Sequence, residues 1–561
     1  MRYDFFVYIA LLITPERTIE MSEHWWQRAV VYQIYPRSFQ DSNGDGIGDL
    51  PGIISRLDYL KQLGVGALWL SPVYQSPNAD NGYDISDYQA INPEYGTMAD
   101  MERLIQEARQ RDIRIVMDLV VNHTSDEHAW FVNARTGMDS STRDYYVWSD
   151  PVDGHEPNDL TSGFIGGSAW EHDSTSDQYF LHLFSAKQVD LNWQSPKLRQ
   201  AIYDMMNFWI AKGIGGFRMD VIDMIGKEPF EKQLVNGPHL HDYLHEMNRA
   251  TWADRDFLTV GEAWSAGPKE ALQYSCPARQ ELSMIFQFGH LWADRKVGGE
   301  KWETHPISVP QLKAALYACQ RELATDGWNS LFWNNHDLPR AVSRFGTPTG
   351  PNRELSAKML AITLHGLKGT PYIYQGEEMG MTDCPVTMIE QVDDVEARTI
   401  YRQLRVQGDS ATTAMEKVNR FSRDNARTPM QWDASLNAGF STGQPWLAVN
   451  PNYQTINVQA TLTEPDSVFE TYQQLIQLRK TQPVLQTGAF QALAVPDDVI
   501  AYTRTLGEVT WLVCSNFGAE PVDVTLPQRV AKRLVGNYDD YPDQLGDVQL
   551  RPYEAFMVAL Q

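Results

Sequence analysis

Short apolar runs alternate with amphipathic stretches from about residue 30 to residue 480. Eight of the runs are almost continuously apolar, which is typical of strands buried on both faces of a parallel sheet. The predicted strands are 30–35, 66–70, 113–121, 216–221, 258–261, 284–288, 331–333 and 371–374. Predicted helices between them include 52–63, 98–111, 196–212, 309–323 and 354–367. This alternation predicts an α/β protein, a (β/α)8 TIM barrel.

Two connections in the predicted barrel are unusually long. The segment 123–190, after the third strand, is too long for a plain loop, so we expect an inserted subdomain over the barrel mouth. From about residue 483 the pattern changes to short β-rich runs, which predict a C-terminal antiparallel β-sandwich domain. The predicted division is a dispensable extension 1–20, barrel 21–122, subdomain 123–190, barrel 191–482 with an excursion at about 381–440, and β domain 483–561.

The apolar run 5–13 is too short to span a bilayer. Arg2 is the basic residue before it, Asp4 interrupts it, and no small-x-small cleavage site follows, which is not typical of a signal peptide. Because Met21 stands just before the first predicted strand, we expect residues 1–20 to be dispensable. We expect no membrane partner.

Composition narrows the class of partner. The net charge of −25 argues against nucleic acid, because phosphate groups would be repelled over most of the surface. Aromatic residues make up 11% of the chain, which leaves rings for a cleft that binds a small neutral substrate such as a sugar. The four cysteines are scattered without a C-x-x-C pair, so we expect reduced thiols in the cytoplasm. We also expect a monomer.

Acidic side chains stand at the predicted carboxyl ends of separate strands, where barrels of this kind place their chemistry. Asp220 ends the fourth strand, Glu262 follows the fifth and Asp337 follows the seventh. Buried carboxylates that converge repel one another, so fold stability explains them poorly. Arg218 lies on the same side of its strand as Asp220 and is expected to lower the pKa of that acid. A structural Arg–Asp pair explains this stretch alone equally well.

Four motifs carry these residues in order: 118–123 (DLVVNH), 216–220 (GFRMD), 261–264 (GEAW) and 334–337 (NNHD). They resemble the signature regions of the alpha-amylase superfamily, and 188–192 (QVDLN) resembles its fifth region. Over about 24–561 the chain is most similar to the oligo-1,6-glucosidase group, on the stretches 76–85 (SPNADNGYDI) and 423–432 (RDNARTPMQW). The stretches 281–288 and 440–446 are most similar to the dextran glucosidases of that group.

The resemblance implies retaining hydrolysis of an α-glucosidic bond. In this family pattern Asp220 is the nucleophile, Glu262 the general acid/base, and Asp337 the third carboxylate that holds the sugar hydroxyls. Beside Glu262, Ala263 and Trp264 form an expected apolar wall that raises the pKa of this acid.

The resemblance also implies which residues bind the terminal glucose. Substrate-binding roles fall to Asp80, Tyr83, His123, Arg218 and His336. Arg423 is the expected cation that holds Asp80, with Arg427 as second choice. Such a closed pocket accepts only a chain end, so we expect an exo-acting enzyme.

Val221 follows the nucleophile, and valine at this place is typical of family members that prefer α-1,6 links. Ordinary strand packing explains a valine there as well. By similarity to dextran glucosidases, Lys301 and Glu396 are expected to hold the sugar on the leaving side, although each is also an ordinary surface charge.

The loop 41–49 (DSNGDGIGD) places oxygen ligands at alternating positions around glycines, a spacing that can wrap a hard cation. Related glucosidases bind calcium here, which implies a structural Ca²⁺ and no organic cofactor. A turn rich in Asp and Gly is the alternative. The expected ligands are Asp41, Asn43, Asp45, the Ile47 carbonyl and Asp49.

The expected function is therefore exo-hydrolysis of α-1,6 bonds in isomaltooligosaccharides and dextran fragments. An α-1,4-glucosidase and a trehalose-6-phosphate hydrolase of the same superfamily remain alternatives, the latter needing a cationic phosphate pocket. A sucrose isomerase is disfavoured because 343–347 (SRFGT) is not its Arg-rich loop. An ancillary binding subunit on this fold is the non-enzyme alternative.

Overall fold

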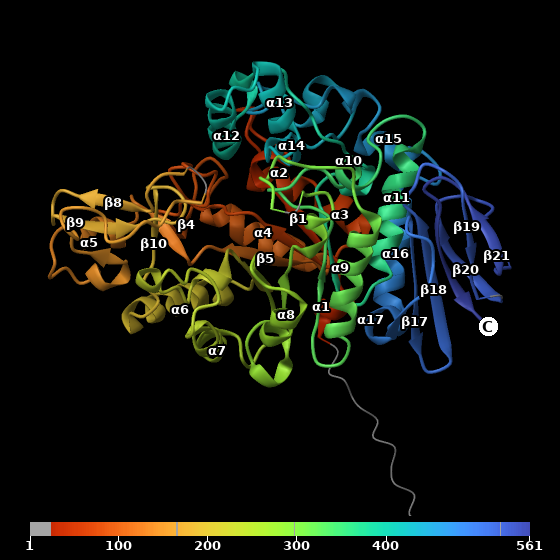
Figure 1. The fold of residues 1–561 in the computed structure, drawn as a ribbon, viewed down its shortest axis with the longest axis horizontal. Helices are drawn as coiled ribbons and strands as arrows, with labels where there is room; N and C mark the ends of the chain where they lie inside the picture. The colour runs from red at the N-terminus through yellow and green to blue at the C-terminus, as the bar shows by residue number, and fades with distance from the viewer. Residues whose placement is uncertain (1–23, 164–165, 297, 528, 543) are drawn as a thin grey trace, which may run out of the picture.

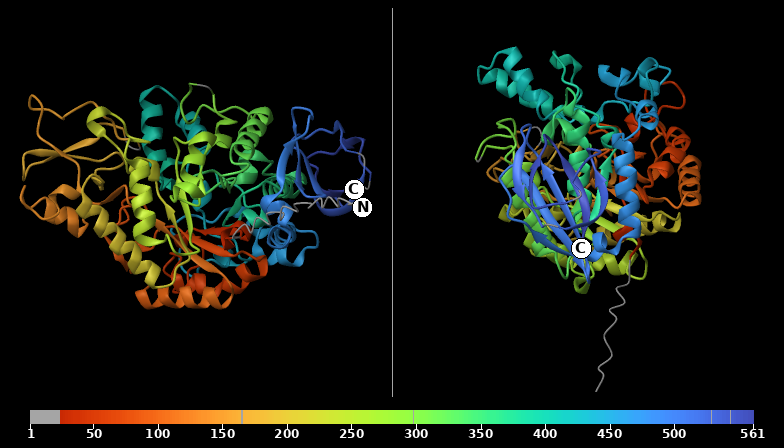
Figure 2. Two further views of the ribbon diagram at one scale, coloured as in Figure 1. Left: turned by 90° about the horizontal axis from the view of Figure 1, so that it is seen from below. Right: turned by 90° about the vertical axis from the view of Figure 1, so that its right-hand side faces the viewer.

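The computed structural model describes residues 24–163, 166–296, 298–527, 529–542 and 544–561. The predicted extension 1–20 lies outside these residues. Figures 1 and 2 show a central barrel with the subdomain after β5 at one end of the long axis and the C-terminal β domain at the other.

Eight parallel strands form the barrel, in the order β13-β12-β11-β5-β2-β1-β15-β14. The TIM barrel predicted from the sequence is confirmed, and each predicted strand overlaps one of these. Between the two outermost strands of this order, the Ser330 hydroxyl donates to the Ile285 carbonyl at 2.8 Å. The strands are β1 Val31–Ile34, β2 Ala67–Leu70, β5 Arg114–Leu119, β11 Gly216–Met219, β12 Leu258–Glu262, β13 Met284–Phe286, β14 Ser330–Leu331 and β15 Thr370–Tyr374.

Helices cover the outside of the barrel. The helix predicted over 52–63 is wrong as a single element, because Arg56 has non-helical backbone angles (φ −107°, ψ 5°) and divides it in two. A capping box of Thr97 and Asp100 starts α4. The helices are α2 Leu50–Ser55, α3 Leu57–Leu63, α4 Met98–Gln110, α6 Pro196–Ala211, α7 Leu240–Thr251, α8 Pro268–Ser275, α9 Val309–Glu322, α11 Asn352–His365 and α16 Val468–Thr481.

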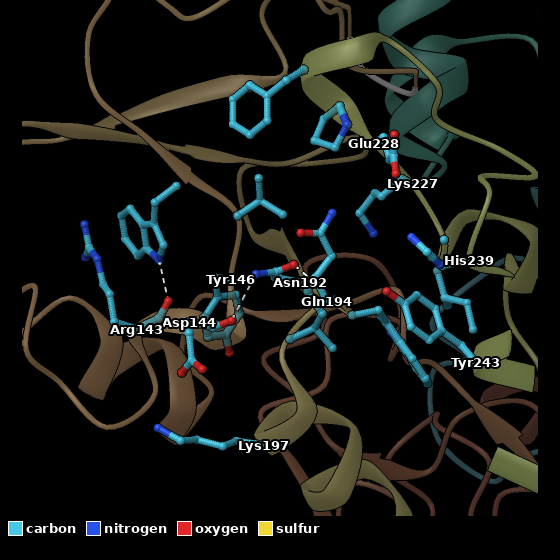
Figure 3. Close-up of a pocket in the computed structure, with 18 of the residues that line it drawn as sticks. Arg143, Asp144, Tyr146, Asn192, Gln194, Lys197, Lys227, Glu228, His239 and Tyr243 are labelled. Atoms are coloured by element: carbon cyan, nitrogen blue, oxygen red, sulfur yellow. Dashed lines mark hydrogen bonds between the residues drawn. The ribbon is translucent and has the colours of Figure 1, made fainter. Parts of the chain in front are cut away.

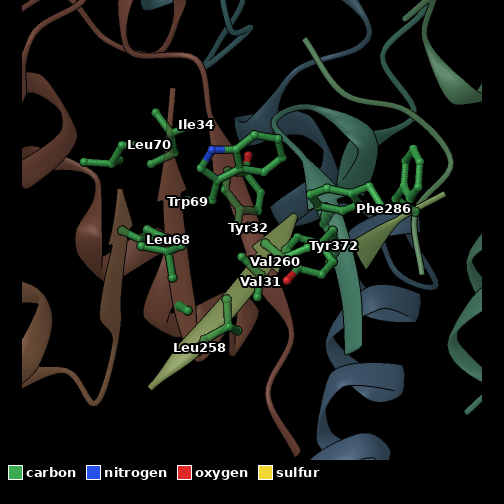
Figure 4. Close-up of a cluster of buried hydrophobic side chains, with 14 of the residues drawn as sticks. Val31, Tyr32, Ile34, Leu68, Trp69, Leu70, Leu258, Val260, Phe286 and Tyr372 are labelled. Carbon is green, nitrogen blue, oxygen red and sulfur yellow. The ribbon is translucent and has the colours of Figure 1, made fainter. Parts of the chain in front are cut away.

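Large apolar side chains fill the middle of the barrel (Figure 4). Trp69, Val260, Phe286 and Tyr372 are all at most 2% exposed. Close-packed aromatic and branched residues leave little freedom to the strands that carry them. The carboxyl ends of the strands are therefore rigid supports for the polar residues that stand on them.

The segment between β5 and α6 forms its own small sheets. β6 His123–Ser125 pairs with β10 Gln188–Asp190, and β9 Gln178–Leu181 pairs with β7 Trp148–Ser149 and β8 Trp170–Asp173. After β15, α12 Val395–Val406 and α13 Ala411–Asn419 pack around a separate apolar cluster. Short elements elsewhere in the chain are α1 Trp25–Arg28, β3 Tyr74–Gln75, β4 Asp87–Ile91, α5 Ala129–Ala134, α10 Ala341–Phe345, α14 Asp424–Arg427, α15 Val458–Thr463 and α17 Pro483–Thr487.

The C-terminal domain consists of a five-stranded antiparallel sheet, β16-β17-β18-β22-β20, and a two-stranded sheet, β19-β21. Both contribute to one apolar cluster, which contains Leu512, Val524 and Leu550. No helix in the described part of the chain is long and apolar enough to cross a bilayer. The strands are β16 Ala489–Ala492, β17 Val499–Leu506, β18 Val509–Asn516, β19 Val522–Thr525, β20 Val530–Gly536, β21 Asp547–Leu550 and β22 Ala555–Leu560.

Candidate active site

A cavity of about 340 Å³ opens at the carboxyl ends of the barrel strands. Its walls combine residues from the barrel, the inserted subdomain and the excursion after β15. The structure thus brings together side chains that lie up to several hundred positions apart in sequence. Ten of the predicted site residues line it: Asp80, Tyr83, His123, Asp220, Val221, Glu262, Lys301, Asp337, Glu396 and Arg423.

Arg218 is the centre of the site, fully buried at the end of β11. Its Nη1 lies 2.7 Å from Asp220 and 2.9 Å from Asp118, and its Nη2 binds Glu262. Strand alternation places Arg218 and Asp220 on the same side, while Glu262 arrives from the neighbouring strand β12. Both predicted catalytic carboxyls therefore meet on one guanidinium. Asp118 was not predicted as part of the site, although the first motif contains it.

The pKa of Glu262 lies above the pKa of Asp220, as an acid/base beside a nucleophile requires. Burial raises the pKa of Asp220 to about 6, although Arg218 acts to lower it. Arg218 lowers the pKa of Asp220 as expected, but loss of water outweighs the cation, so the net shift is upward. Burial raises the pKa of Glu262 further, to about 8, against the same Arg218. Near neutral pH Asp220 is mostly ionised and Glu262 mostly protonated.

Trp264 differs from its predicted role as an apolar wall. Its indole Nε1–H donates to Glu262 Oε1 at 2.9 Å, and its ring stacks on Phe288 with centroids 3.6 Å apart. The side chain is 39% exposed at the cavity. A donor to a carboxylate favours the charged form, so Trp264 itself acts against the raised pKa of Glu262.

Val221 lies beyond the end of β11, in the left-handed region with φ +35°. A β-branched residue there is a strained outlier, and such strain clusters at functional sites. Its backbone N–H points to Glu262 Oε2 at 3.3 Å, and its side chain lines the cavity. Ordinary strand packing therefore does not explain this valine.

Asp337 is held by cations from a distant part of the chain. Arg427 Nη2 lies 2.6 Å from Asp337 Oδ1, and Arg423 Nη1 lies 3.7 Å from it. Burial alone would raise the pKa of Asp337, but His336, Arg427 and Arg423 together hold it far below its usual range. Asp337 is therefore a permanent anion in the cavity.

His336 and Tyr83 form a stacked pair, with parallel rings 5.3 Å apart. Gln33 donates to His336 Nδ1 at 2.8 Å, which leaves the proton on Nε2, 2.7 Å from the Tyr83 hydroxyl. That hydroxyl in turn donates to Asp118 at 3.1 Å. Burial lowers the pKa of His336 to about 3, so the ring is a neutral hydrogen-bond donor.

Asp80 lies between the subdomain and the excursion. Gln188 Nε2 lies 3.1 Å from Asp80 Oδ2 and 3.3 Å from His123 Nε2. Arg423 Nη1 lies 3.6 Å from Asp80 Oδ1, so the first-choice cation stands beside this acid. Gln188 was not predicted as a site residue, although the fifth motif contains it.

Asp394 is the third site residue that was not predicted, and no recognised motif contains it. It is fully buried and binds Arg423 through the backbone N–H at 2.9 Å, Nε at 2.9 Å and Nη2 at 2.8 Å. The pKa of Asp394 falls to about 2, because Arg423 and Arg427 outweigh burial. Asp394 thereby fixes the guanidinium that faces Asp80 and Asp337.

Lys301 and Glu396 form an ion pair of 2.6 Å on the wall of the same cavity. Lys301 comes from the loop after β13, and Glu396 from the first turn of α12. The structure therefore places both residues at the cavity and against each other.

The loop 41–49 is a chain of tight turns. Asp41, Asn43 and Asp45 each accept the backbone N–H two residues onward, at 2.9, 2.8 and 2.8 Å. These bonds already occupy one side-chain oxygen of each of these three expected ligands. The Asp41 carboxylate also binds Gly46 and Ser441, and no cluster of three Asp, Glu, His or Cys able to hold a metal occurs in the described ranges. None of these residues lines the catalytic cavity, and calcium stays a prediction.

Comparisons with known proteins agree with this geometry. The model described as alpha amylase, catalytic domain, matches residues 33–488, and the alpha-amylase SusG C-terminal domain matches 499–556. A glucan 1,6-alpha-glucosidase of Streptococcus pneumoniae is 57% identical over 542 residues, 96% of this chain and 100% of the relative. An oligo-1,6-glucosidase of Parageobacillus thermoglucosidasius is 51% identical over 558 residues, 95% of this chain and 99% of the relative.

Among solved structures, a trehalose-6-phosphate hydrolase of Bacillus licheniformis superimposes with a TM-score of 0.92 at 44% identity. The match covers 96% of this chain and 100% of that chain. The family resemblance predicted from the four motifs is confirmed. Because the catalytic-domain model spans most of the chain and both relatives align over almost their whole length, the chain belongs to the alpha-amylase family of glycoside hydrolases.

Proposed function

We propose that this enzyme removes glucose from the non-reducing end of isomaltooligosaccharides and dextran fragments, by retaining hydrolysis of α-1,6-glucosidic bonds. The observation that carries the proposal is the arrangement of Asp220 and Glu262 on Arg218, with pKa values of about 6 and about 8. Relatives with 57% and 51% identity are named glucan 1,6-alpha-glucosidase and oligo-1,6-glucosidase, which supports the substrate class.

The proposed reaction has two steps. The Asp220 carboxylate attacks the anomeric carbon while the bond to the leaving oxygen breaks, and Glu262 gives its proton to that oxygen. The glucose is now an ester of Asp220, and Glu262 is a carboxylate. Glu262 then takes a proton from water, the water oxygen attacks the anomeric carbon, and the ester bond to Asp220 breaks. Both acids return to their initial protonation states.

The remaining polar residues suit a grip on one terminal glucose. Asp337 is a fixed anion on the cavity wall and suits a sugar hydroxyl as an acceptor, whereas the Nε2–H of His336 is directed at the Tyr83 hydroxyl, so in this proposal His336 acts on the sugar through Tyr83. Asp80 and Arg423 offer an acceptor–donor pair on the side of the subdomain. In this proposal the pocket is closed beyond the terminal sugar, which makes the enzyme exo-acting.

The leaving-side sugar lies toward Val221, Lys301 and Glu396 in this proposal. The pair Lys301–Glu396 offers donors and acceptors to a neutral sugar. Trehalose 6-phosphate, the substrate named for the solved relative, would need an uncommitted cation for its phosphate. Glu396 already neutralises Lys301. The other cation on this wall, Arg295, lies over the Trp292 ring at 4.8 Å, so the neutral substrate is supported mainly by the names of the relatives. A rate on trehalose 6-phosphate above that on isomaltose would contradict this choice.

Three further properties belong to the proposal. The loop 41–49 holds a structural Ca²⁺ through the side chains of Asp41, Asn43, Asp45 and Asp49 and the Ile47 carbonyl. The protein works as a cytoplasmic monomer with reduced cysteines. All four cysteines lie as free thiols in the described part of the chain, which supports a reducing compartment.

The linkage is tested by comparing kcat/KM on isomaltose with kcat/KM on maltose. We expect a clear preference for isomaltose, because the motif residue Val221 is placed at the cavity beside both acids. A preference for maltose would refute the α-1,6 assignment and leave the hydrolase assignment intact. No turnover of either disaccharide would refute both.

A further inference from the structure

A second and larger cavity, of about 730 Å³, lies outside the catalytic pocket. Its walls come from residues 138–148 of the inserted subdomain, 191–197 at the start of α6, and 225–243 after β11 (Figure 3). Lys227 lies on its wall and also binds Asn122, the neighbour of His123, at 2.7 Å. A polar contact therefore links the wall of this cavity to the residue beside His123, which lines the catalytic cavity.

Two of the cations on this wall are already neutralised or enclosed. Arg143 stacks on Trp148 at 3.3 Å and binds Gln178. Lys227 is buried and pairs with Asp190 at 3.0 Å. The Lys227 charge is therefore paired. The Arg143 guanidinium, in contrast, is held by Trp148 and Gln178 without an acidic partner in the described ranges.

The acids on the wall are uncompensated. Asp144, Glu228 and Glu231 form no ion pair within the described ranges, and Lys197 is the cation that stands against them. The excess negative charge repels phosphate and other anions. The described residues contain no cluster of acids able to hold a metal ion, and a neutral ligand needs neither such a cluster nor an unpaired cation.

Hydrogen-bonding groups and an aromatic face are free in this cavity. The Glu228 carboxylate and the Tyr243 hydroxyl have no hydrogen-bond partner among the described residues, and Figure 3 shows the Tyr243 hydroxyl turned toward the middle. Phe230 is 54% exposed and rests on Trp170 with ring centroids 5.7 Å apart. A supported ring with an open face beside polar acceptors suits the C–H face and the hydroxyls of a sugar.

We propose that this cavity is a second carbohydrate site that binds a neutral glucan segment. The proposal rests on the proposed function for the class of sugar. Holding a long substrate at a second site raises its concentration near the catalytic pocket. The site therefore contributes to the binding of dextran and long isomaltooligosaccharides, whereas isomaltose turnover depends on the catalytic pocket.

The test uses the double variant Glu228→Gln/Phe230→Ser. Its matched control is Glu416→Gln/Val406→Ser, in which an exposed acid and an apolar side chain 89% exposed are changed at positions that line neither cavity. With the wild-type chain as background, we expect KM for dextran to rise about five- to tenfold, from one lost hydrogen bond and one lost stacking face. We expect kcat/KM for isomaltose to stay unchanged. An unchanged KM for dextran, with an unchanged melting temperature, would overturn the proposal.

Binding is measured separately from catalysis by titrating the Asp220→Asn variant with a long isomaltooligosaccharide. Two binding events per chain are expected, and one when Glu228→Gln/Phe230→Ser is added. A single event before the cavity is changed would overturn the second site. The proposed activity is judged independently by isomaltose hydrolysis with the wild-type chain. If that activity is absent while the cavity-dependent event persists, the proposed function fails and the second site stands.

Discussion

The indole of Trp264 provides a sharp test of how the acid/base is tuned. In the substitution Trp264→Phe the ring stacked on Phe288 is kept, and the N–H that reaches Glu262 Oε1 at 2.9 Å is lost. A hydrogen bond to a charged group contributes about 1.5–3 kcal/mol, and the partial exposure of Trp264 reduces this to about 1–1.5 kcal/mol. The lost bond stabilised the carboxylate, so its removal raises the pKa of Glu262 by about 1.

The assay is the pH dependence of kcat/KM for isomaltose, which reports on the free enzyme. For the wild type we expect a bell with an acid limb near the pKa of Asp220, about 6, and an alkaline limb near that of Glu262, about 8. The two values belong to a coupled pair on Arg218. Since Glu262 must be protonated to act as acid, the alkaline limb of Trp264→Phe should move upward by about one pH unit. The acid limb should stay in place.

Phe288→Leu is the matched control, because it weakens the stacking without touching the indole N–H. Its alkaline limb should coincide with that of the wild type. A Trp264→Phe limb that stays in place, or moves toward lower pH, would refute the role assigned to the indole. Equal upward movement in both variants would assign the effect to packing instead of the hydrogen bond.

Three more predictions follow from the geometry. Asp394→Ala leaves the buried Arg423 without its main partner, so the free energy of unfolding should fall by about 3–5 kcal/mol in urea titrations. The control Asp393→Ala, at the half-exposed neighbouring position, should leave the free energy of unfolding nearly unchanged. Val221→Gly removes the strained left-handed valine, so the free energy of unfolding should stay the same or rise by up to about 1 kcal/mol. The same change should lower kcat/KM for isomaltose. A clear loss of stability would show that the Val221 backbone is not strained. Prolonged chelation should lower the melting temperature but leave activity in the cold intact, and an unchanged melting temperature would remove the calcium proposal.

The strands of the barrel were predictable because buried parallel strands leave a strong apolar signal. Residues 216–219 and 258–262 form strands close to where the pattern placed them, and Asp220 and Glu262 follow at their ends. The break of the predicted helix 52–63 was not predictable in this way. Arg56 is an ordinary helix former, and its contacts with Gln40 and Trp432, distant in sequence, are not visible in a local pattern.

The pKa values of the site and the partners of its buried charges could not be predicted from the sequence. The sequence shows Arg218 two positions before Asp220, but the net pKa depends on burial and on Asp118, which local order does not report. Asp394 lies in an irregular excursion, with no periodic pattern to indicate that it faces Arg423. Gln188 and Asp118 were visible inside recognised motifs, so a residue-by-residue use of those motifs would have found them.

The central claim is that Asp220 forms the covalent bond to glucose while Glu262 moves the proton. Peptide mass mapping after reaction with a slow-reacting fluorinated α-glucosyl fluoride tests it most directly. We predict a single glucosyl adduct on the peptide that contains Asp220, absent from the Asp220→Asn variant. An adduct on Glu262, or turnover of the same reagent by Asp220→Asn at the wild-type rate, would contradict the claim.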